Sequence, residues 1–237
     1  MPDRPSLLLL PGLLCDAAVW RHQAAALAET HDTLVPDFFG LDAIATMAEL
    51  VLDRAPRRFS LAGHSMGARV ALEVLRRAPD RVERLALLDT GVHPRRSGEE
   101  ERRRELVDLA YERGMAALAE RWLPPMLHPD RLADAPLMAE LTAMVCRATP
   151  EIHEGQIRAL LGRPDASAQL SGIAVPTLLA CGRQDAWSPL AQHEAMATAI
   201  PGAELVVIED SGHMAPAERP EAVTAALARW LRTSTRT

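Results

Sequence analysis

Short, almost continuously apolar runs alternate with amphipathic segments along most of this 237-residue chain. Six of these runs predict strands, at residues 6–10, 33–36, 59–63, 84–89, 177–182 and 204–209. Helical spacing of apolar residues predicts helices at 17–29, 43–55, 66–77, 190–199 and 220–232. Strands that are apolar on both faces and separated by helices are typical of a parallel sheet covered on both sides. The sequence therefore predicts an α/β fold with a mostly parallel, six-stranded sheet.

The alternation stops in one long segment. From about residue 93 to residue 171 the sequence has no convincing strand, only helical stretches interrupted by prolines. We expect a core formed by residues 1–92 and 172–237, and a helical cap inserted at 93–171. The stretch RRSGEEERRR near its start mixes both charges, which is typical of a solvated helix start. The cap interior is rich in methionine, which either lines an adaptable pocket or forms ordinary core.

Composition excludes several classes of partner. The net charge of −6 and the pI near 5.8 argue against binding to nucleic acid or to an anionic membrane surface. Cys15, Cys146 and Cys181 have no CxxC spacing, so neither a disulfide framework nor a thiolate metal site is expected. The leucine-rich start is broken by Pro11-Gly12 and is too short to span a bilayer. We expect a cytoplasmic protein that acts on a small molecule; composition does not indicate its oligomeric state.

A serine stands between two glycines where the third predicted strand meets a helix. The motif is Gly63-His64-Ser65-Met66-Gly67. Glycines at both flanks remove side chains that would clash if the serine adopted a strained conformation in a sharp turn. Such a turn holds the hydroxyl at the carboxyl edge of the sheet, where open α/β sheets bind their ligands. Ser65 is therefore a candidate nucleophile. The same sequence pattern also fits a turn in which the serine hydroxyl only caps the helix.

A serine nucleophile needs a base, and the base needs a group that orients it. His213 follows the last predicted strand in the stretch VVIEDSGHMAPAERP, and Asp185 follows the preceding strand in LLACGRQDAWSP. The chain order serine, aspartate, histidine is one that folds with a parallel α/β sheet use for a catalytic triad. Asp89 at the end of the fourth strand is a rival for the acid, whereas His64 is expected to be a packing residue.

Catalysis at a carbonyl also needs two donors for the oxyanion. The backbone N–H of Met66 is one candidate, because it opens the helix after the serine. The other is expected in the loop after the first strand, from Leu13 or Leu14. Cys15 in the same loop is expected to be a buried, inert thiol.

At these residues the sequence resembles the α/β-hydrolase fold superfamily, in particular its compact bacterial esterase-like members with a helical cap. The resemblance rests on the stretches LLLLPGLL, GHSMGARVALE, GRQDAWSP and SGHMAPAERPEAV. It implies hydrolysis through an acyl-enzyme, with Ser65 as nucleophile, His213 as general base and then acid, and Asp185 as its orienter. It also implies an oxyanion hole made by Leu13 and Met66, with no cofactor and no metal.

The sequence departs from the pattern of this superfamily in two places. Many relatives carry His-Gly where this chain has Pro11-Gly12, which leaves the shape of the oxyanion loop open. The first two strands of the standard fold also have no counterpart. Ser65 excludes the haloalkane dehalogenase and epoxide hydrolase branches, because those enzymes need a carboxylate at this position.

The leading functional interpretation is a carboxylic ester hydrolase for a small or medium apolar acyl substrate. The side chains expected to contact that substrate combine one cation with large apolar groups: Arg69, Trp122, Met126, Met144 and Trp187.

Two other functions fit the same residues. The stretch SMGARVAL resembles the menaquinone-pathway synthase that eliminates pyruvate, so a lyase or carbon–carbon bond hydrolase is an alternative, with Arg69 binding a substrate carboxylate. A surface arginine on the helix is the plainer interpretation of Arg69. The third function is a non-catalytic ligand receptor on the same fold.

Overall fold

The computed structural model describes residues 4–234. Six strands form one sheet in the order β2-β1-β3-β4-β5-β6, and every neighbouring pair is parallel. The strands are β1 (Ser6–Leu10), β2 (Asp32–Leu34), β3 (Phe59–His64), β4 (Val82–Leu88), β5 (Thr177–Gly182) and β6 (Glu204–Ile208). The predicted six-stranded sheet is confirmed, and it is parallel throughout.

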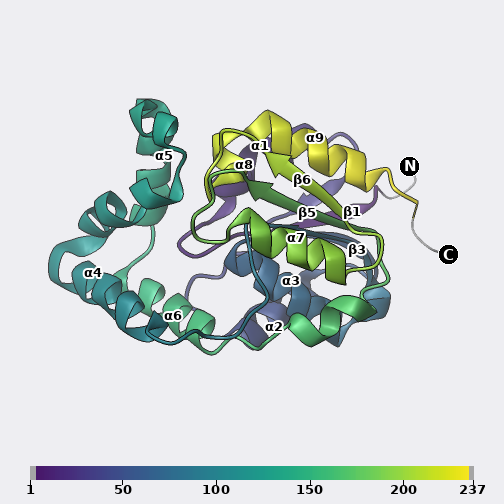
Figure 1. The fold of residues 1–237 in the computed structure, drawn as a ribbon, viewed down its shortest axis with the longest axis horizontal. Helices are drawn as coiled ribbons and strands as arrows, with labels where there is room; N and C mark the ends of the chain where they lie inside the picture. Colours follow the sequence, from purple (N-terminus) through teal and green to yellow (C-terminus); the bar gives the residue numbers. More distant parts are fainter. Residues whose placement is uncertain (1–3, 235–237) are drawn as a thin grey trace.

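Helices cover both faces of this sheet (Figure 1). On one side α1 (Arg21–Leu27) packs against α9 (Pro220–Leu231), and on the other α2 (Ile44–Arg54) packs against α3 (Met66–Arg77). A further helix, α7 (Leu190–Ala199), contacts β5 and β6, and the short 3-10 helix η2 (Pro79–Arg81) precedes β4. None of the helices within residues 4–234 has the length and apolarity needed to cross a bilayer.

Two short helices near the N- and C-terminal parts of the chain differ from the predicted elements. The helix expected at 17–29 is divided into a 3-10 turn, η1 (Ala17–Trp20), and α1, and the Asp16 carboxylate caps η1 by accepting the Ala18 N–H at 2.8 Å. The four-residue helix α8 (Ala215–Glu218) was not predicted, because four residues are too few to show helical periodicity.

The segment between β4 and β5 contains no strand in the described chain. It contains the helices α4 (Glu99–Trp122), α5 (Ala135–Cys146) and α6 (Pro150–Leu161), with the 3-10 turns η3 (Pro124–Met126), η4 (Pro129–Ala133) and η5 (Ser167–Gly172). Prolines occupy the first turn of several of these elements, where a missing N–H costs no hydrogen bond. We call residues 93–171 the insertion, with the limits predicted from the sequence. In Figure 1 its helices α4 and α5 lie beside the edge toward which the arrows of β5 and β6 point.

The packing of α3 on the sheet depends on one glycine. Helix α3 is buried along most of its length, and its first turn lies against the end of β1. A Cβ atom at Gly67 would lie 2.2 Å from the carbonyl oxygen of Leu10. No side chain fits that space, because real Cβ atoms do not approach backbone oxygens so closely. Gly67 thus brings the start of α3 directly against β1.

We expect Gly67→Ala to lower the free energy of unfolding by about 1–3 kcal/mol, because α3 must move away from β1. Gly155→Ala is the matched control: this glycine lies inside α6 and a Cβ there meets its nearest atom at 3.6 Å. The control is expected to be neutral or stabilising by up to about 1 kcal/mol. Chemical denaturation measures both, and equal stability of Gly67→Ala and the wild type would contradict the packing described.

Candidate active site

Ser65 occupies a one-residue turn between β3 and α3. Its backbone has φ 53° and ψ −113°, a region that non-glycine residues rarely adopt. The turn is closed by packing, because a Cβ atom at Gly63 would lie 2.5 Å from the backbone of Gly67 and Ala68. The Ser65 N–H donates to the Leu88 carbonyl at 2.9 Å, which ties the turn to β4. The strained backbone is thus held by contacts on both sides.

Two loops bring a histidine and an aspartate to this serine. The Nε2 atom of His213 lies 2.8 Å from Ser65 Oγ, and its Nδ1 atom lies 2.8 Å from Asp185 Oδ2. The other carboxylate oxygen of Asp185 accepts the N–H groups of Trp187 and Ser188 at 2.8 and 2.9 Å. Burial alone raises the pKa of Asp185, but the contact with His213 and these two amides outweigh it and lower the pKa below its usual value. Asp185 therefore stays ionised beside His213.

Asp89, the rival acid, does not contact His213. Its Oδ1 atom accepts the Gly182 N–H at 2.9 Å, and its Oδ2 atom has no hydrogen-bond partner in the described chain. Burial raises the pKa of Asp89 well above its usual value, and the nearby charge of Asp185 adds to this. The structure thus brings Asp185, rather than Asp89, to the histidine.

His64 does more than pack. It is almost completely buried, and its Nε2–H group donates to the backbone carbonyl of His213 at 2.7 Å. Burial lowers the pKa of His64 to about 3, with a further contribution from His213, so the ring is neutral. His64 therefore packs as expected, and its side chain also supports the loop that carries His213.

The loop after β1 distinguishes the two candidate oxyanion donors. The N–H of Leu14, a residue with φ 57°, donates to Gln156 Oε1 at 2.8 Å and is therefore occupied. The N–H of Leu13 has no acceptor within residues 4–234. Met66 is the first residue of α3, so its N–H is also unused by the helix. These geometries favour Leu13 over Leu14 as the second donor; no local sequence pattern marks Gln156.

Ser65 and His213 line a cavity of about 1040 Å³. Leu13 and Met66 lie at the same cavity, as do four of the five predicted contact residues, Arg69, Trp122, Met126 and Trp187. Met144 does not line it, which corrects that prediction. The Met144 side chain is fully buried in α5, which packs against α4, so it belongs to the interior of the insertion.

The cavity also has charged lining residues, of which the sequence predicted only Arg69. Arg69 is 8% exposed and lines the cavity, so the plainer interpretation of a surface arginine is corrected. Its Nη1 group donates to the His93 carbonyl at 2.8 Å. Burial, together with the nearby charge of Arg163, lowers the pKa of Arg69 to about 9.

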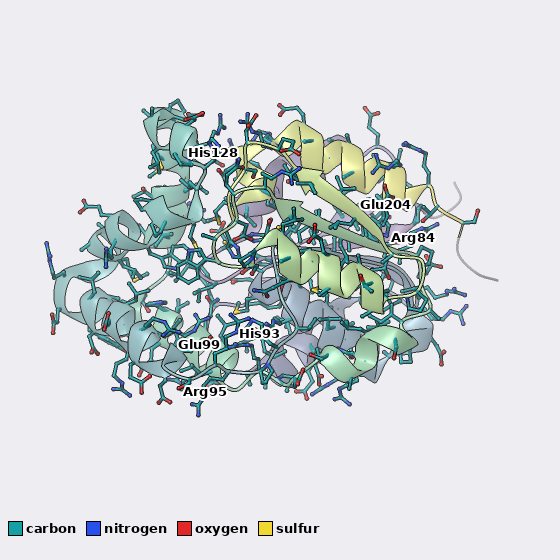
Figure 2. All side chains as sticks on the ribbon, viewed as in Figure 1. Arg84, His93, Arg95, Glu99, His128 and Glu204 are labelled. Atoms are coloured by element: carbon teal, nitrogen blue, oxygen red, sulfur yellow. The ribbon has the colours of Figure 1, made fainter. Side chains whose placement is uncertain are left out.

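Glu99 begins α4 and is buried, rather than solvated as expected for the charged stretch. Its carboxylate accepts hydrogen bonds from Arg163 at 2.8 Å and from Arg103 at 2.9 Å. Burial opposes ionisation of Glu99, but the arginines outweigh it and lower its pKa to about 2. Figure 2 shows Glu99 and His93 on neighbouring segments at this end of the insertion. Arg163 comes from a segment 64 positions along the chain, so local charge patterning could not predict the pair.

The other possible nucleophile, Cys15, and the possible metal ligands near the site do not suit those roles. Cys15 is buried, and burial raises the pKa of its thiol to about 12, which removes it as a nucleophile near neutral pH. Asp89, Cys181 and Asp185 place ligand atoms within 4.8 Å of one another. Both oxygens of Asp185 already accept hydrogen bonds, and burial raises the pKa of the Cys181 thiol. This group fits a hydrogen-bonded cluster better than a metal site.

Comparison with known proteins agrees with this fold. A sequence model of the alpha/beta hydrolase family matches residues 7–226. The chain belongs to the alpha/beta hydrolase family. The match confirms the resemblance that the motifs indicated. It extends over nearly the whole of this hydrolase chain.

Three relatives illustrate the branch in which this alpha/beta hydrolase lies. It is 28% identical over 225 residues to a pimeloyl-[acyl-carrier protein] methyl ester esterase of Nitrosomonas europaea, covering 88% of each chain. It is 30% identical over 234 residues to a putative carbamate hydrolase of Klebsiella pneumoniae, covering 90% of this chain and 85% of the other. A malate-bound thermophilic esterase from Thermogutta terrifontis superimposes with a TM-score of 0.88 at 31% identity, over 97% and 90% of the chains. These relatives support a hydrolase activity for the chain.

Proposed function

We propose that this protein is a serine hydrolase that cleaves a carboxylic ester, or a related acyl substrate, through an acyl-enzyme intermediate. The observation that carries the proposal is the unbroken chain of hydrogen bonds from Ser65 Oγ through the His213 ring to Asp185, with both links at 2.8 Å. A serine hydroxyl becomes nucleophilic when a base removes its proton, and a buried carboxylate orients that base and stabilises its charged form. The cavity gives a substrate access to the hydroxyl.

In the first half-reaction Ser65 Oγ attacks the carbonyl carbon of the ester, and His213 Nε2 takes the serine proton. The carbonyl oxygen becomes an oxyanion that accepts the free N–H groups of Leu13 and Met66. Collapse of this intermediate breaks the bond to the leaving alcohol, which receives its proton from His213. In the second half-reaction water attacks the acyl-serine with His213 as base, which releases the acid and restores Ser65.

The cavity lining supports the substrate class in this proposal. Leu13, Met66, Trp122 and Met126 are among the apolar residues that line the same cavity as Ser65. These side chains suit a small or medium apolar acyl group. The named activities of the relatives, on a methyl ester and on carbamates, share attack at a carbonyl carbon that bears a heteroatom leaving group.

A second candidate function, a lyase or carbon–carbon bond hydrolase, is favoured by one observation. Arg69 is buried at the cavity that Ser65 lines, and the His93 carbonyl is its one hydrogen-bond acceptor within residues 4–234. Its remaining N–H groups are free to bind a substrate carboxylate in a bidentate manner. The ester hydrolase remains the leading proposal, because its machinery needs no carboxylate on the substrate.

Kinetics on a panel of esters with increasing acyl length tests the leading proposal. We expect Ser65→Ala and Asp185→Asn each to lower kcat by about 10⁴-fold, because the first removes the nucleophile and the second the charge that orients His213. Asp89→Asn is the matched control, since Asp89 is equally buried but does not contact His213; its kcat is expected within about tenfold of the wild type. A folded wild type that cleaves no ester in the panel would contradict the proposal.

A comparison of Arg69→Ala on two substrates separates the two candidate functions. If the protein is an ester hydrolase for neutral substrates, kcat/KM for a neutral apolar ester is expected to change by less than about tenfold. The lyase interpretation instead requires about 100-fold loss on a dicarboxylate substrate, because a charge-assisted hydrogen bond disappears. Arg102→Ala is the control, since Arg102 lines the same cavity but is exposed. Wild-type turnover of the dicarboxylate with such a loss would replace the leading proposal.

A further inference from the structure

One buried carboxylate near the site has no part in the chemistry described above. Glu218 ends α8 and is 1% exposed. Its Oε1 atom accepts the N–H groups of Gly212 at 2.9 Å and Met214 at 3.2 Å, and its Oε2 atom accepts the N–H of His128 at 2.7 Å. A carboxylate so deeply buried needs several donors, and here all three are backbone amides.

These three amides come from two segments of different origin. Gly212 and Met214 flank His213 in the loop after β6, whereas His128 belongs to the insertion. Figure 2 shows His128 at the junction between the insertion and the core. Glu218 therefore bridges the loop that carries His213 and the insertion that covers the cavity.

The two segments also touch directly. The His213 N–H donates to the Met126 carbonyl at 2.6 Å. A Cβ atom at Gly212 would lie 2.4 Å from that same carbonyl oxygen, so only glycine permits this approach. Three successive residues of the loop are thus held against residues 126–128, directly or through Glu218. The position of the His213 ring depends on where this part of the insertion lies.

Small displacements of a catalytic base have large effects, because a shift of about 1 Å can reduce the rate by about 100-fold. We propose that Glu218 is a positioning residue that ties the His213 loop to residues 126–128 of the insertion. The position of these residues relative to the core then determines how the His213 ring is aligned with Ser65. The inference rests on the proposed function, since it takes His213 as the general base. It assigns the insertion a role in catalysis besides forming the cavity wall.

His128→Pro breaks the tie at its insertion end. The substitution removes the N–H that donates to Glu218 and puts a ring carbon in its place, so the carboxylate must move away from residue 128. It also removes the imidazole, and the backbone accepts it because His128 already has φ −60°. Leu127 is extended, with φ −105° and ψ 157°, as a residue before proline should be. His128→Ala is the matched control, because it removes the imidazole and keeps the N–H. We expect His128→Pro to lower kcat on an ester about 10- to 100-fold relative to His128→Ala, with KM within about threefold.

A second pair of variants changes the carboxylate itself. In Glu218→Gln one oxygen becomes an NH₂ group that must face a backbone N–H, so at least one of the two links is broken. We expect kcat to fall by about tenfold or more at unchanged KM. Glu73→Gln is its control, because Glu73 is a buried acid on α3 that pairs with Arg76 and Arg77 and does not line the cavity. Equal kcat in His128→Pro and His128→Ala would overturn the proposal, as would equal losses in Glu218→Gln and Glu73→Gln.

Amide hydrogen exchange separates a failure of this proposal from a failure of the proposed function. In His128→Pro we expect faster exchange than in His128→Ala for peptides covering 211–215, since the loop loses its anchor on the insertion. Unchanged exchange in that loop would refute the tie whether or not the protein cleaves esters. Faster exchange in a protein that cleaves no ester would count against the proposed function alone.

Discussion

The left-handed backbone of Ser65 is the constraint on which the site depends. A single residue reverses the chain from β3 into α3, and it can do so only because Gly63 and Gly67 leave no side chain in the space where the two elements and β1 meet. The same close approach sets the start of α3 at the carboxyl edge of the sheet, with the Met66 N–H unused. Strain of this kind persists only where the surrounding packing holds it.

Parallel pairing of the strands then brings distant loops to this turn. Residues 185 and 213 follow β5 and β6, and the carboxyl ends of parallel strands share one edge of the sheet. This is why the strands, the turn at Ser65 and the partners Asp185 and His213 could be predicted from the sequence. Each is marked locally, by an apolar run, by flanking glycines or by a polar residue just after a strand.

Several contacts that the sequence did not reveal are long-range. Gln156 reaches Leu14 across 142 positions, and Glu218 reaches His128 across 90. Glu99 lies in a stretch whose charges suggest solvation, but its partner Arg163 arrives from elsewhere and permits burial. Methionine is a common residue in adaptable pockets, but the packing of α5 on α4 buries the Met144 side chain in the interior of the insertion. Composition and periodicity describe one element at a time and therefore do not predict such pairings.

These long-range contacts give the insertion two links to the site, one to the oxyanion loop through Gln156 and one to the His213 loop through Glu218. The geometry of the site therefore depends on the insertion as well as on the sheet. Ser65 is proposed to be an activated nucleophile in this setting. The intact mass of the protein after exposure to a fluorophosphonate probe, compared between the wild type and Ser65→Ala, tests this directly. We expect one adduct per wild-type chain and none on the variant. A well-folded wild type without an adduct, or an adduct that persists on Ser65→Ala, would contradict it.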